Sequence, residues 1–382
     1  MRAKDINGFP RLGIIGGGQL AKMMAQEAKK MGFFVSVLDP TPGCPASSVS
    51  DLQVVGDFYD EEKLEELVNQ SDVTTYDLEH IATEPLKRLE EKGHAILPSP
   101  RLLEVIQDKL VQKEMLKKAG IPVPRFMKVE QNSLDEFKKF GFPLVQKARK
   151  GGYDGRGVAV IGSEKDMAKA LLTESYAEEL VDIEKELAVM VARSTEGQVK
   201  CYPVVEMIFD ERANICDMVV APARIEKELE QKAREIATEV VKALDGVGVF
   251  GIEMFLDRKG NILVNEVAPR PHNSGHYTIE ACLTSQFEQH IRAICGLPLG
   301  STKLLSPAAM VNLLGEEGYE GTPWVEGFEE VLSIEGLYFH FYGKKTTKPF
   351  RKMGHVTVID DDVEKAVEKA RRAKEILKVK AR

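Results

Sequence analysis

The sequence has no apolar run long enough to span a membrane, and its N-terminus lacks the pattern of a signal peptide. Its five cysteines are scattered and odd in number, and no Cys-x-x-Cys pair occurs, which argues against a disulfide framework and favours a reducing cytoplasm. A net charge of −8 argues against a broad nucleic-acid-binding surface. What remains is a cytoplasmic globular protein, and its 382 residues are enough for two or three domains.

The N-terminal third alternates short apolar strands with helices, which predicts the α/β class with an open parallel sheet. Residues 11–39 read as strand, glycine turn, helix and strand. Gly16, Gly18 and Ala21 have the spacing of a dinucleotide-binding turn, and Asp39 ends the second strand. The same turn also holds other phosphates, or simply packs a helix on a strand. Glu79 follows a later strand end, as a ligand-binding residue or as part of a surface pair with His80.

A basic helix predicted over 109–120 ends at two prolines, which indicate a domain boundary. The unit after it is expected to hold a helix at 133–140 and strands at 143–148 and 158–161. Between these strands, four glycines lie among basic and acidic residues at 149–157. Such a loop can lay backbone N–H groups on phosphates, or can simply be a mobile hairpin tip. It is not a Walker A loop, because no Gly-Lys-Ser/Thr follows.

The middle of the chain contains an acidic segment that precedes a strand over 186–192. Its backbone can read an adenine edge while Glu186 accepts ribose hydroxyls; the alternative is a solvated acidic patch. Near the C-terminus, Lys344, Arg351 and Lys352 form a basic loop that either binds a phosphate or is a solvated turn. The remaining expected elements are strands at 199–209, 216–221, 308–314, 336–342 and 355–359, and helices at 225–244, 278–295 and from 361 onward.

Residues 251–276 carry the strongest chemical signal in the sequence. They predict a hairpin with Glu253 on one strand and Asn265–Glu266 on the other, all among apolar neighbours. Two buried carboxylates need cations, either Lys and Arg side chains or a Mg²⁺ ion that also binds nucleotide phosphates. The loop that follows places Arg270, His272 and Asn273 after the second carboxylate. Its prolines and glycine disfavour a helix, and with it a zinc site at His272 and His276.

Four motifs occur in family order over nearly the whole chain: GIIGGGQLAKM, KARKGGYDGRG, NEVAPRPHNSGH and YGKK…RKMGHVTV. On these motifs the sequence resembles the ATP-grasp ligases, and more closely the N5-carboxyaminoimidazole ribonucleotide synthetases of purine biosynthesis. The resemblance implies a Rossmann-like pre-ATP-grasp domain at 1–107, a small lid domain at 108–183, a large domain at 184–300 and a C-terminal subdomain at 301–382.

The resemblance also implies a reaction. ATP would phosphorylate bicarbonate to carboxyphosphate, and the amine of 5-aminoimidazole ribonucleotide would take up the carboxyl group, giving N5-carboxyaminoimidazole ribonucleotide, ADP and phosphate. Mg²⁺, as one or two ions, would be the cofactor. A homodimer is expected, with hand-over of the product to the mutase that acts next, and with neither a nucleic-acid nor a membrane partner.

The resemblance assigns roles residue by residue. Arg270 would clamp carboxyphosphate, His272 would act on a proton, and Lys344 would complete the catalytic set. Mg²⁺ would be held by Glu253 and Glu266. ATP would be bound by Lys109, Lys147, Gly152, Tyr153, Asp154, Gly155, Arg156, Gly157, Val158, Glu178, Glu179, Leu180, Val181, Glu186, Phe209, Asn265 and Glu266. The ribonucleotide and carboxyphosphate would meet Gly17, Gly18, Gln19, Glu79, Tyr153, Asp154, Arg156, Asn273, Lys344, Arg351 and Lys352.

Two positions depart from the family pattern. Met207 stands where relatives commonly have Asn, and Phe209 where some have His, so the adenine pocket is expected to differ in detail while the chemistry is kept.

Three alternatives compete with this interpretation. Another purine ATP-grasp enzyme, the formate-dependent glycinamide ribonucleotide transformylase, shares acyl-phosphate chemistry but fits GGYDGRG and RKMGH less well. An NAD-dependent oxidoreductase would rest on the glycine turn and Asp39 alone, and would leave the carboxylate hairpin unexplained. A non-catalytic nucleotide sensor would have no need for both carboxylates together with Arg270 and His272.

Overall fold

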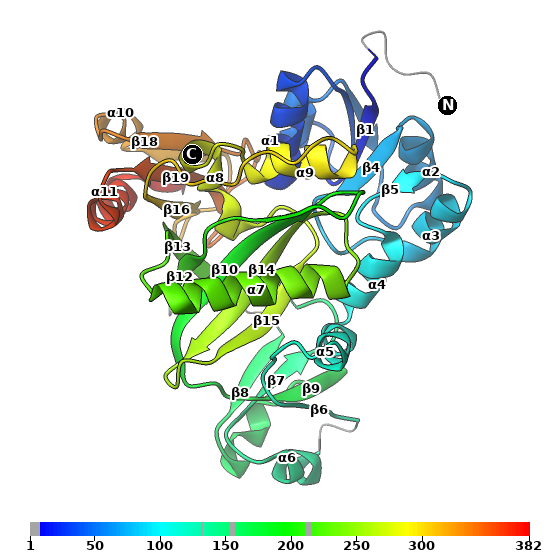
Figure 1. Cartoon of the computed structure of the whole chain (residues 1–382). Coiled ribbons are helices and arrows are strands. Elements are labelled where there is room, and N and C mark those ends of the chain that lie inside the picture. The colour runs from blue at the N-terminus through cyan, green and yellow to red at the C-terminus, as the bar shows by residue number, and fades with distance from the viewer. Residues whose placement is uncertain (1–7, 131–132, 153–156, 211–214) are drawn as a thin grey trace.

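The structure is a computed structural model that describes residues 8–130, 133–152, 157–210 and 215–382. In Figure 1 the N-terminal parallel sheet lies at the upper right, and a large antiparallel sheet crosses the centre behind helix α7. A small sheet hangs below, and the C-terminal strands extend to the upper left. This confirms the predicted α/β class, with mixed α+β architecture after residue 107. Within the described ranges, no helix has the length and apolarity that crossing a membrane requires.

The N-terminal sheet has the order β3-β2-β1-β4-β5, with every pair parallel. The order reverses between β1 and β4, so the glycine turn after β1 lies at the switch point, where open α/β sheets bind ligands. The strands are β1 (Arg11–Ile15), β2 (Phe34–Asp39), β3 (Leu52–Val55), β4 (Val73–Tyr76) and β5 (Ala95–Ile96). The helices are α1 (Gln19–Lys30), α2 (Glu61–Asn69), α3 (Thr83–Glu91) and α4 (Pro100–Gln107), with a 3₁₀ turn at Pro45–Val49.

Helix α5 (Lys109–Lys118) leads into a four-stranded antiparallel sheet of order β6-β9-β7-β8. Asp108 caps α5 by accepting from the N–H groups of Leu110 and Val111. Although α5 precedes the small sheet, its Leu116 packs into the core of the large sheet. The small sheet consists of β6 (Phe126–Lys128), β7 (Leu144–Ala148), β8 (Val158–Ile161) and β9 (Ser175–Glu179), with α6 (Leu134–Phe140) and a 3₁₀ turn at Glu164–Lys169.

The large sheet follows the order β15-β14-β10-β12-β13-β16-β19-β18, with β11 beside β10. Because β13 pairs with β16, the C-terminal strands extend the same sheet; the domain boundaries given above stay predictions. The strands are β10 (Ile183–Arg193), β11 (Val199–Cys201), β12 (Val205–Asp210), β13 (Ile215–Ala221), β14 (Gly248–Asp257), β15 (Ile262–Ala268), β16 (Ala308–Leu314), β18 (Leu337–Phe341) and β19 (Lys352–Ile359). β17 (Pro323–Glu326) and β20 (Lys378–Ala381) form a separate pair, and α10 (Phe328–Val331) and α11 (Val363–Ile376) complete the C-terminal part.

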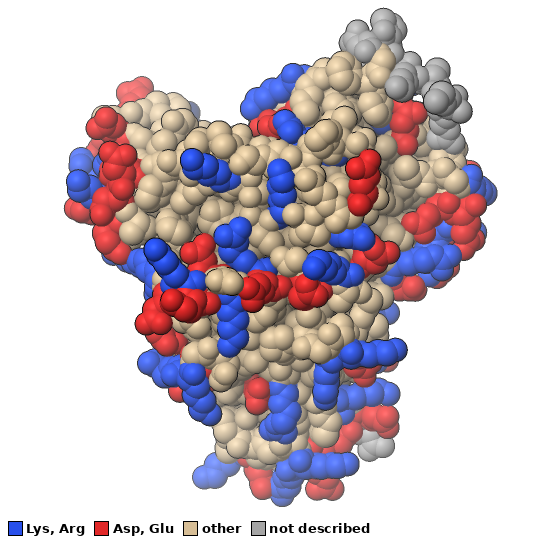
Figure 2. Space-filling model, in the orientation of Figure 1, with Lys and Arg blue, Asp and Glu red and all other residues tan. Residues whose placement is uncertain are grey.

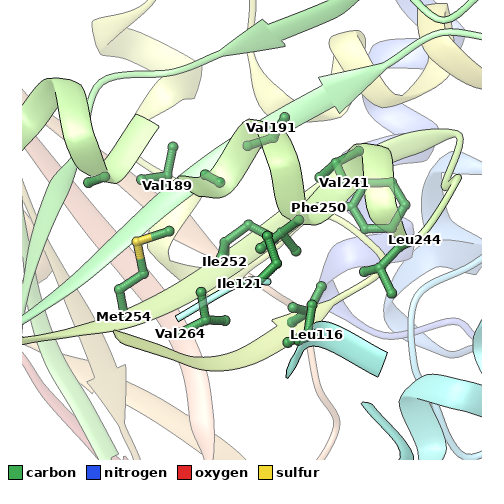
Figure 3. Close-up of a cluster of buried hydrophobic side chains, with 14 of the residues drawn as sticks. Leu116, Ile121, Val189, Val191, Val241, Leu244, Phe250, Ile252, Met254 and Val264 are labelled. Atoms are coloured by element: carbon green, nitrogen blue, oxygen red, sulfur yellow. The ribbon is translucent and has the colours of Figure 1, made fainter. Parts of the chain in front are cut away.

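Helix α7 (Lys227–Ala243) covers one face of this sheet. Alternate residues of β10 and β14, including Val189 and Ile252, point toward α7 and form the core drawn in Figure 3. On its outer side α7 is polar, and Figure 2 shows acidic and basic side chains interspersed on this face. The strand residues between the core positions face away from α7, and Glu186 and Glu253 are among them.

Two predicted elements are wrong as drawn from the sequence. The helix expected over 278–295 is two, α8 (Thr278–Ala281) and α9 (Gln286–Ile294), because Cys282 forms a β-bridge to Leu304 and Ser285 caps α9. The strand expected over 199–209 breaks into β11 and β12 around Pro203, which has no N–H to donate. The other predicted helices and strands are confirmed, with shifts at their ends.

Candidate active site

The hairpin of β14 and β15 contains a β-bulge at its two acidic positions. Glu253 lies opposite Glu266, but Met254 lies opposite Val264, so Asn265 is an extra residue in β15. Asn265 and Glu266 therefore both lie across from Glu253, and Asn265 Nδ2 donates to Glu253 Oε2 at 3.4 Å. The bulge thus gathers two carboxylates and an amide on one short stretch of sheet.

Two lysines from separate elements meet these groups. Lys109 Nζ, on α5, lies 2.7 Å from Glu266 Oε2. Lys147 Nζ, on β7, donates to Asn265 Oδ1 at 2.9 Å and to Glu178 Oε1 at 2.5 Å. The sequence left two possible partners for the carboxylates, a basic side chain or a Mg²⁺ ion. In this structure Glu266 is paired with a lysine side chain.

Glu253 differs from Glu266 in its charge balance. Burial, and then the negative charges of Glu266 and Glu186, raise the pKa of Glu253 to about 7, against a smaller lowering by Lys109. A cation bound beside Glu253 would oppose this shift, because it would stabilise the ionised form of the buried carboxylate. The carboxylate and amide oxygens present are ligands that Mg²⁺ accepts together with phosphate oxygens.

The loop after β15 connects this hairpin to the N-terminal sheet. Arg270 Nη2 lies 2.8 Å from Glu79 Oε1, and Glu79 follows β4. His272 Nε2 lies 3.4 Å from Glu253 Oε1. The His272 side chain packs so closely on β14 that a Cβ at Gly251 would fall 2.6 Å from the His272 Cβ. Arg270 and His272, two of the three residues predicted to be catalytic, thus lie between the carboxylate hairpin and the end of β4.

The glycine turn after β1 is held by two carboxylates. Gly17 N donates to Asp39 Oδ2 at 3.0 Å, and Gly18 N donates to Asp77 Oδ2 at 3.1 Å. Asp39 also accepts from Thr41 N at 2.8 Å. The acid that an NAD site would use for a ribose is therefore already bonded to its own loop. Burial raises the pKa of Asp77 to about 6, against the backbone amides of Ala21 and Gly18, which both donate to it.

The basic loop near the C-terminus lies against α1, whose first residue is Gln19. Lys22 Nζ, on α1, donates to the carbonyl oxygens of Phe341 and Tyr342 at 3.2 and 3.0 Å. Lys344 Nζ donates to Lys352 O at 2.8 Å, and Arg351 Nη1 donates to Thr346 O at 2.7 Å. Lys352 is close enough to Glu253 to lower its pKa.

Asn273 links the same region to β16. It exchanges two hydrogen bonds with Asn312, of 2.9 and 2.8 Å. The predicted substrate residues that the structure describes thus come from the glycine turn, the end of β4, the loop after β15 and the basic loop.

Tyr153, Asp154, Gly155 and Arg156 lie outside the described residues. Gly152 and Gly157 flank them, and Val158 begins β8 with 39% of its surface exposed.

The expected adenine segment is less open than the sequence indicated. Glu179 accepts from Arg125 N at 2.8 Å, and the Glu178 carboxylate is buried, whereas Leu180 is 45% exposed and Val181 is half-buried. Leu180 and Val181 are thus the part of this segment left open to a ligand.

The expected ribose acid, Glu186, lies on β10 opposite the buried Met207 of β12. Burial raises the pKa of Glu186 to about 7, with Lys147 opposing the shift. Phe209, two residues after Met207, packs partly buried against the core on this side of the sheet. Both departures from the family pattern therefore lie close to the expected ribose position.

Comparison with known proteins identifies the family. The ribonucleotide synthetase preATP-grasp domain matches residues 9–107, the ATP-grasp domain 114–287, and the phosphoribosylaminoimidazole carboxylase C-terminal domain 308–369. The crystal structure of the N5-carboxyaminoimidazole ribonucleotide synthetase from Thermotoga maritima is 63% identical, with a TM-score of 0.92, over 98% of this chain and 100% of that one. The chain belongs to the N5-carboxyaminoimidazole ribonucleotide synthetase family.

Two further relatives are less similar to this chain in sequence. The synthase from Aspergillus clavatus, solved in complex with ADP and 5-aminoimidazole ribonucleotide, is 35% identical, with a TM-score of 0.88, over 96% of this chain and 98% of that one. The chloroplastic phosphoribosylaminoimidazole carboxylase of Vigna aconitifolia is 41% identical over 91% of this chain, which spans 64% of that longer protein. Family membership makes this chain an ATP-grasp ligase and confirms the resemblance on which the predicted roles were based.

Several buried polar residues of this synthetase lie beside the predicted ones and were not predicted from the sequence. Lys113 is 1% exposed; its Nζ lies 2.9 Å from Glu178 Oε2 and donates to Val264 O at 3.0 Å. A signal was present, because Lys113 lies three residues from both Leu110 and Leu116, on the apolar face of α5. Asp77 and Asn312 were not predicted either. The position of Asp77 directly after β4 could have indicated it, because polar residues at the ends of parallel strands often contact ligands or turns.

The two ammonium groups decide the charge of Glu178. Burial opposes ionisation of this carboxyl, but Lys113 and Lys147 outweigh it and keep the pKa of Glu178 below its ordinary value. Burial lowers the pKa of Lys113 to about 8, against the pull of Glu178.

Proposed function

We propose that the family's reaction takes place between the bulged hairpin and the end of β4. This enzyme carboxylates 5-aminoimidazole ribonucleotide with bicarbonate and ATP, giving N5-carboxyaminoimidazole ribonucleotide, ADP and phosphate in purine biosynthesis. The observation that carries the location is the convergence on one bulge of Lys109 from α5, Lys147 from the small sheet and the Arg270–His272 loop.

ATP fits along the hairpin. Its phosphates would take Lys109 and Lys147 from their present carboxylate and amide partners, since an ammonium prefers the more highly charged phosphate. The adenine would lie against Leu180 and Val181, with Glu186 at the ribose. The glycine loop that begins at Gly152 would cover the phosphates and exclude water from the short-lived carboxyphosphate.

Mg²⁺ fits the same residues. Glu253 and Glu266, with Asn265 beside them, would hold the ion, whose charge would stabilise the ionised form of Glu253 against the effect of burial. Bound there, Mg²⁺ would neutralise charge on the phosphoryl group that passes from ATP to bicarbonate.

The ribonucleotide and carboxyphosphate would lie on the N-terminal side of the hairpin. Arg270, now paired with Glu79, has the planar guanidinium that binds an acyl phosphate through two N–H groups. As the new N–C bond forms, the amine of the substrate loses one proton, and His272 would accept it at Nε2, beside Glu253. The glycine turn, Asn273 and the basic loop with Lys344, Arg351 and Lys352 would surround the ribonucleotide and its phosphate.

Release of ADP tests this function. The enzyme is supplied with Mg²⁺–ATP and bicarbonate, with and without 5-aminoimidazole ribonucleotide, and the product is examined for an acid-labile carboxyl group. Strong stimulation by the ribonucleotide and an acid-labile product are expected. Stimulation by glycinamide ribonucleotide with formate, and none by 5-aminoimidazole ribonucleotide, would instead show the related transformylase activity on the same fold.

Three further properties are proposed from the family resemblance: a cytoplasmic location, a homodimer, and hand-over of the product to the mutase. The five cysteines are free thiols, which supports a reducing compartment. Sedimentation of the purified enzyme measures the oligomeric state, and a monomer at working concentration would contradict the dimer.

A further inference from the structure

Strand β15 is at the end of the large sheet, and its outer edge is met by α5. On one side of the bulge, Val264 O accepts from Lys113 Nζ at 3.0 Å and Val264 N donates to Pro122 O at 2.8 Å. On the other side, Val267 N donates to Gln112 Oε1 at 3.1 Å, and Gln112 Nε2 donates to Val267 O at 3.3 Å. Two buried side chains of one helix therefore bracket the bulge that presents Asn265 and Glu266.

Lys113 differs from Gln112 because it makes a second contact. Its ammonium lies 2.9 Å from Glu178 Oε2, with 1% and 2% of the two side chains exposed. The other oxygen of Glu178 holds Lys147 at 2.5 Å, and Lys147 donates to Asn265, the residue after Val264. The contacts form a closed ring from Lys113 through Glu178, Lys147, Asn265 and the β15 backbone to Lys113 again.

The charges in this ring do not cancel. Two ammonium groups share one carboxylate, which leaves about one positive charge in a region of low dielectric. Without Lys113, Glu178 would balance Lys147 alone, and Lys147 would be bound more tightly to it. A phosphate that competes for Lys147 would then gain less binding free energy, because the contact between Lys147 and Glu178 that it has to displace would be stronger.

We infer that Lys113 is a positioning residue for ATP: it shares the charge of Glu178, so that Lys147 is free to exchange to phosphate. This inference rests on the proposed function, because it takes Lys147 as a phosphate ligand. Gln112 holds the same edge without touching Glu178, so it serves as the purely structural counterpart.

The test compares variants of the full-length enzyme by steady-state kinetics. Lys113→Met is expected to raise the KM for ATP by about tenfold to a hundredfold, the scale of a lost hydrogen bond to a charged group. The KM for 5-aminoimidazole ribonucleotide should change less than about twofold, because Lys113 touches none of the groups on that side. Lys113→Arg, which keeps the charge, should restore most of the ATP affinity.

Gln112→Leu is the matched control, and thermal unfolding is recorded for every variant. Gln112→Leu is expected to lower the melting temperature while leaving the KM for ATP near its wild-type value. An equal rise in that KM for Gln112→Leu, equal rises for both substrates in Lys113→Met, or no change at all would overturn the inference. Should Lys113→Met not fold, Lys113→Gln, which keeps a donor for Val264 O, undergoes the same measurement with the same expected outcomes.

The wild-type enzyme separates the two proposals. If it shows turnover stimulated by 5-aminoimidazole ribonucleotide while the Lys113 variants keep their KM for ATP, the function stands and the role of Lys113 is refuted. Without such stimulation in the wild type, the proposed function itself fails.

Discussion

Two pairs of acidic residues, one beside the glycine turn of the N-terminal sheet and one in the bulged hairpin of the large sheet, are held differently. Asp39 and Asp77 accept hydrogen bonds from backbone amides of the glycine turn beside them. Glu253 and Glu266 contact side chains from other elements, Lys109 and His272 among them. A carboxylate bound to backbone fixes a turn, because the amides cannot leave. A carboxylate bound to a lysine side chain can exchange that partner for a phosphate or a metal ion.

The largest effect is expected at the second pair. Glu266→Gln should keep the fold but lower turnover by roughly 10³-fold, the scale of losing a charge that stabilises the transition state. The reason is that the ATP–Mg²⁺ assembly would lose one of its two carboxylates. ADP release measures the loss, and melting temperature verifies the fold.

Asp39→Asn is the matched change in the first pair. Its single side-chain oxygen can still accept from Gly17 N, while the bond from Thr41 N is lost; because neither bond reaches the bulged hairpin, turnover should stay within about threefold of the wild type. Normal turnover by Glu266→Gln at an ordinary Mg²⁺ concentration would refute the assignment of Glu266 as a Mg²⁺ ligand. It would also refute the functional difference proposed between Glu266 and Asp39.

A second prediction concerns stability against pH at Asp77. Its pKa lies at about 6 when folded, above the ordinary 3.8, so the folded state keeps the proton to higher pH than the unfolded state. Wild-type stability should therefore lose about 3 kcal/mol from this group as the pH rises from about 4 to about 6. Asp77→Asn removes the titrating group, so its unfolding free energy relative to wild type should rise over this window.

Urea unfolding of both proteins across that range measures the difference. A difference independent of pH would show that Asp77 titrates normally, and that its burial carries no electrostatic cost.

The smallest expected effect is steric. Gly251→Ala places a Cβ 2.6 Å from the His272 Cβ, so the imidazole must move away from Glu253. We expect a loss of about tenfold in kcat and about 1–3 kcal/mol in stability, the usual cost of overpacking. Gly300→Ala is the control, because its Cβ would fall 2.2 Å from Thr284 Oγ1, away from the candidate site. It should lose stability without losing kcat, and equal losses of kcat would deny His272 a specific role.

Local patterns were sufficient to predict most of the fold. The strands and helices around the glycine turn follow from apolar spacing and caps such as Asp60, whose side chain accepts from two amides of α2. The division of the helix expected over 278–295 does not follow from local patterns. It depends on Leu304, a residue that pairs with Cys282 only after the chain has folded back. The four motifs predicted the family, which the comparisons confirm, whereas the individual residue roles stay predictions.

The site was predicted less completely, for a related reason. Glu253, Asn265 and Glu266 could be recognised as acidic and amide groups on apolar strands, but a bulge that aligns them has no sequence signature here. Lys113 looked like one of several lysines on a basic helix. Its burial results from the approach of β9 and β15 to α5, which is a tertiary event.

The closure of the β15 edge by α5 also bears on how these chains behave when crowded together. A sheet edge with unpaired N–H and C=O groups is a template on which a strand of another molecule can add. Here two side chains of α5 and the carbonyl group of Pro122 already bond the N–H and C=O groups of Val264 and Val267, so these groups cannot pair with an incoming strand. The helix that carries Lys109 and Lys113 thereby also blocks strand addition at these two residues of the edge.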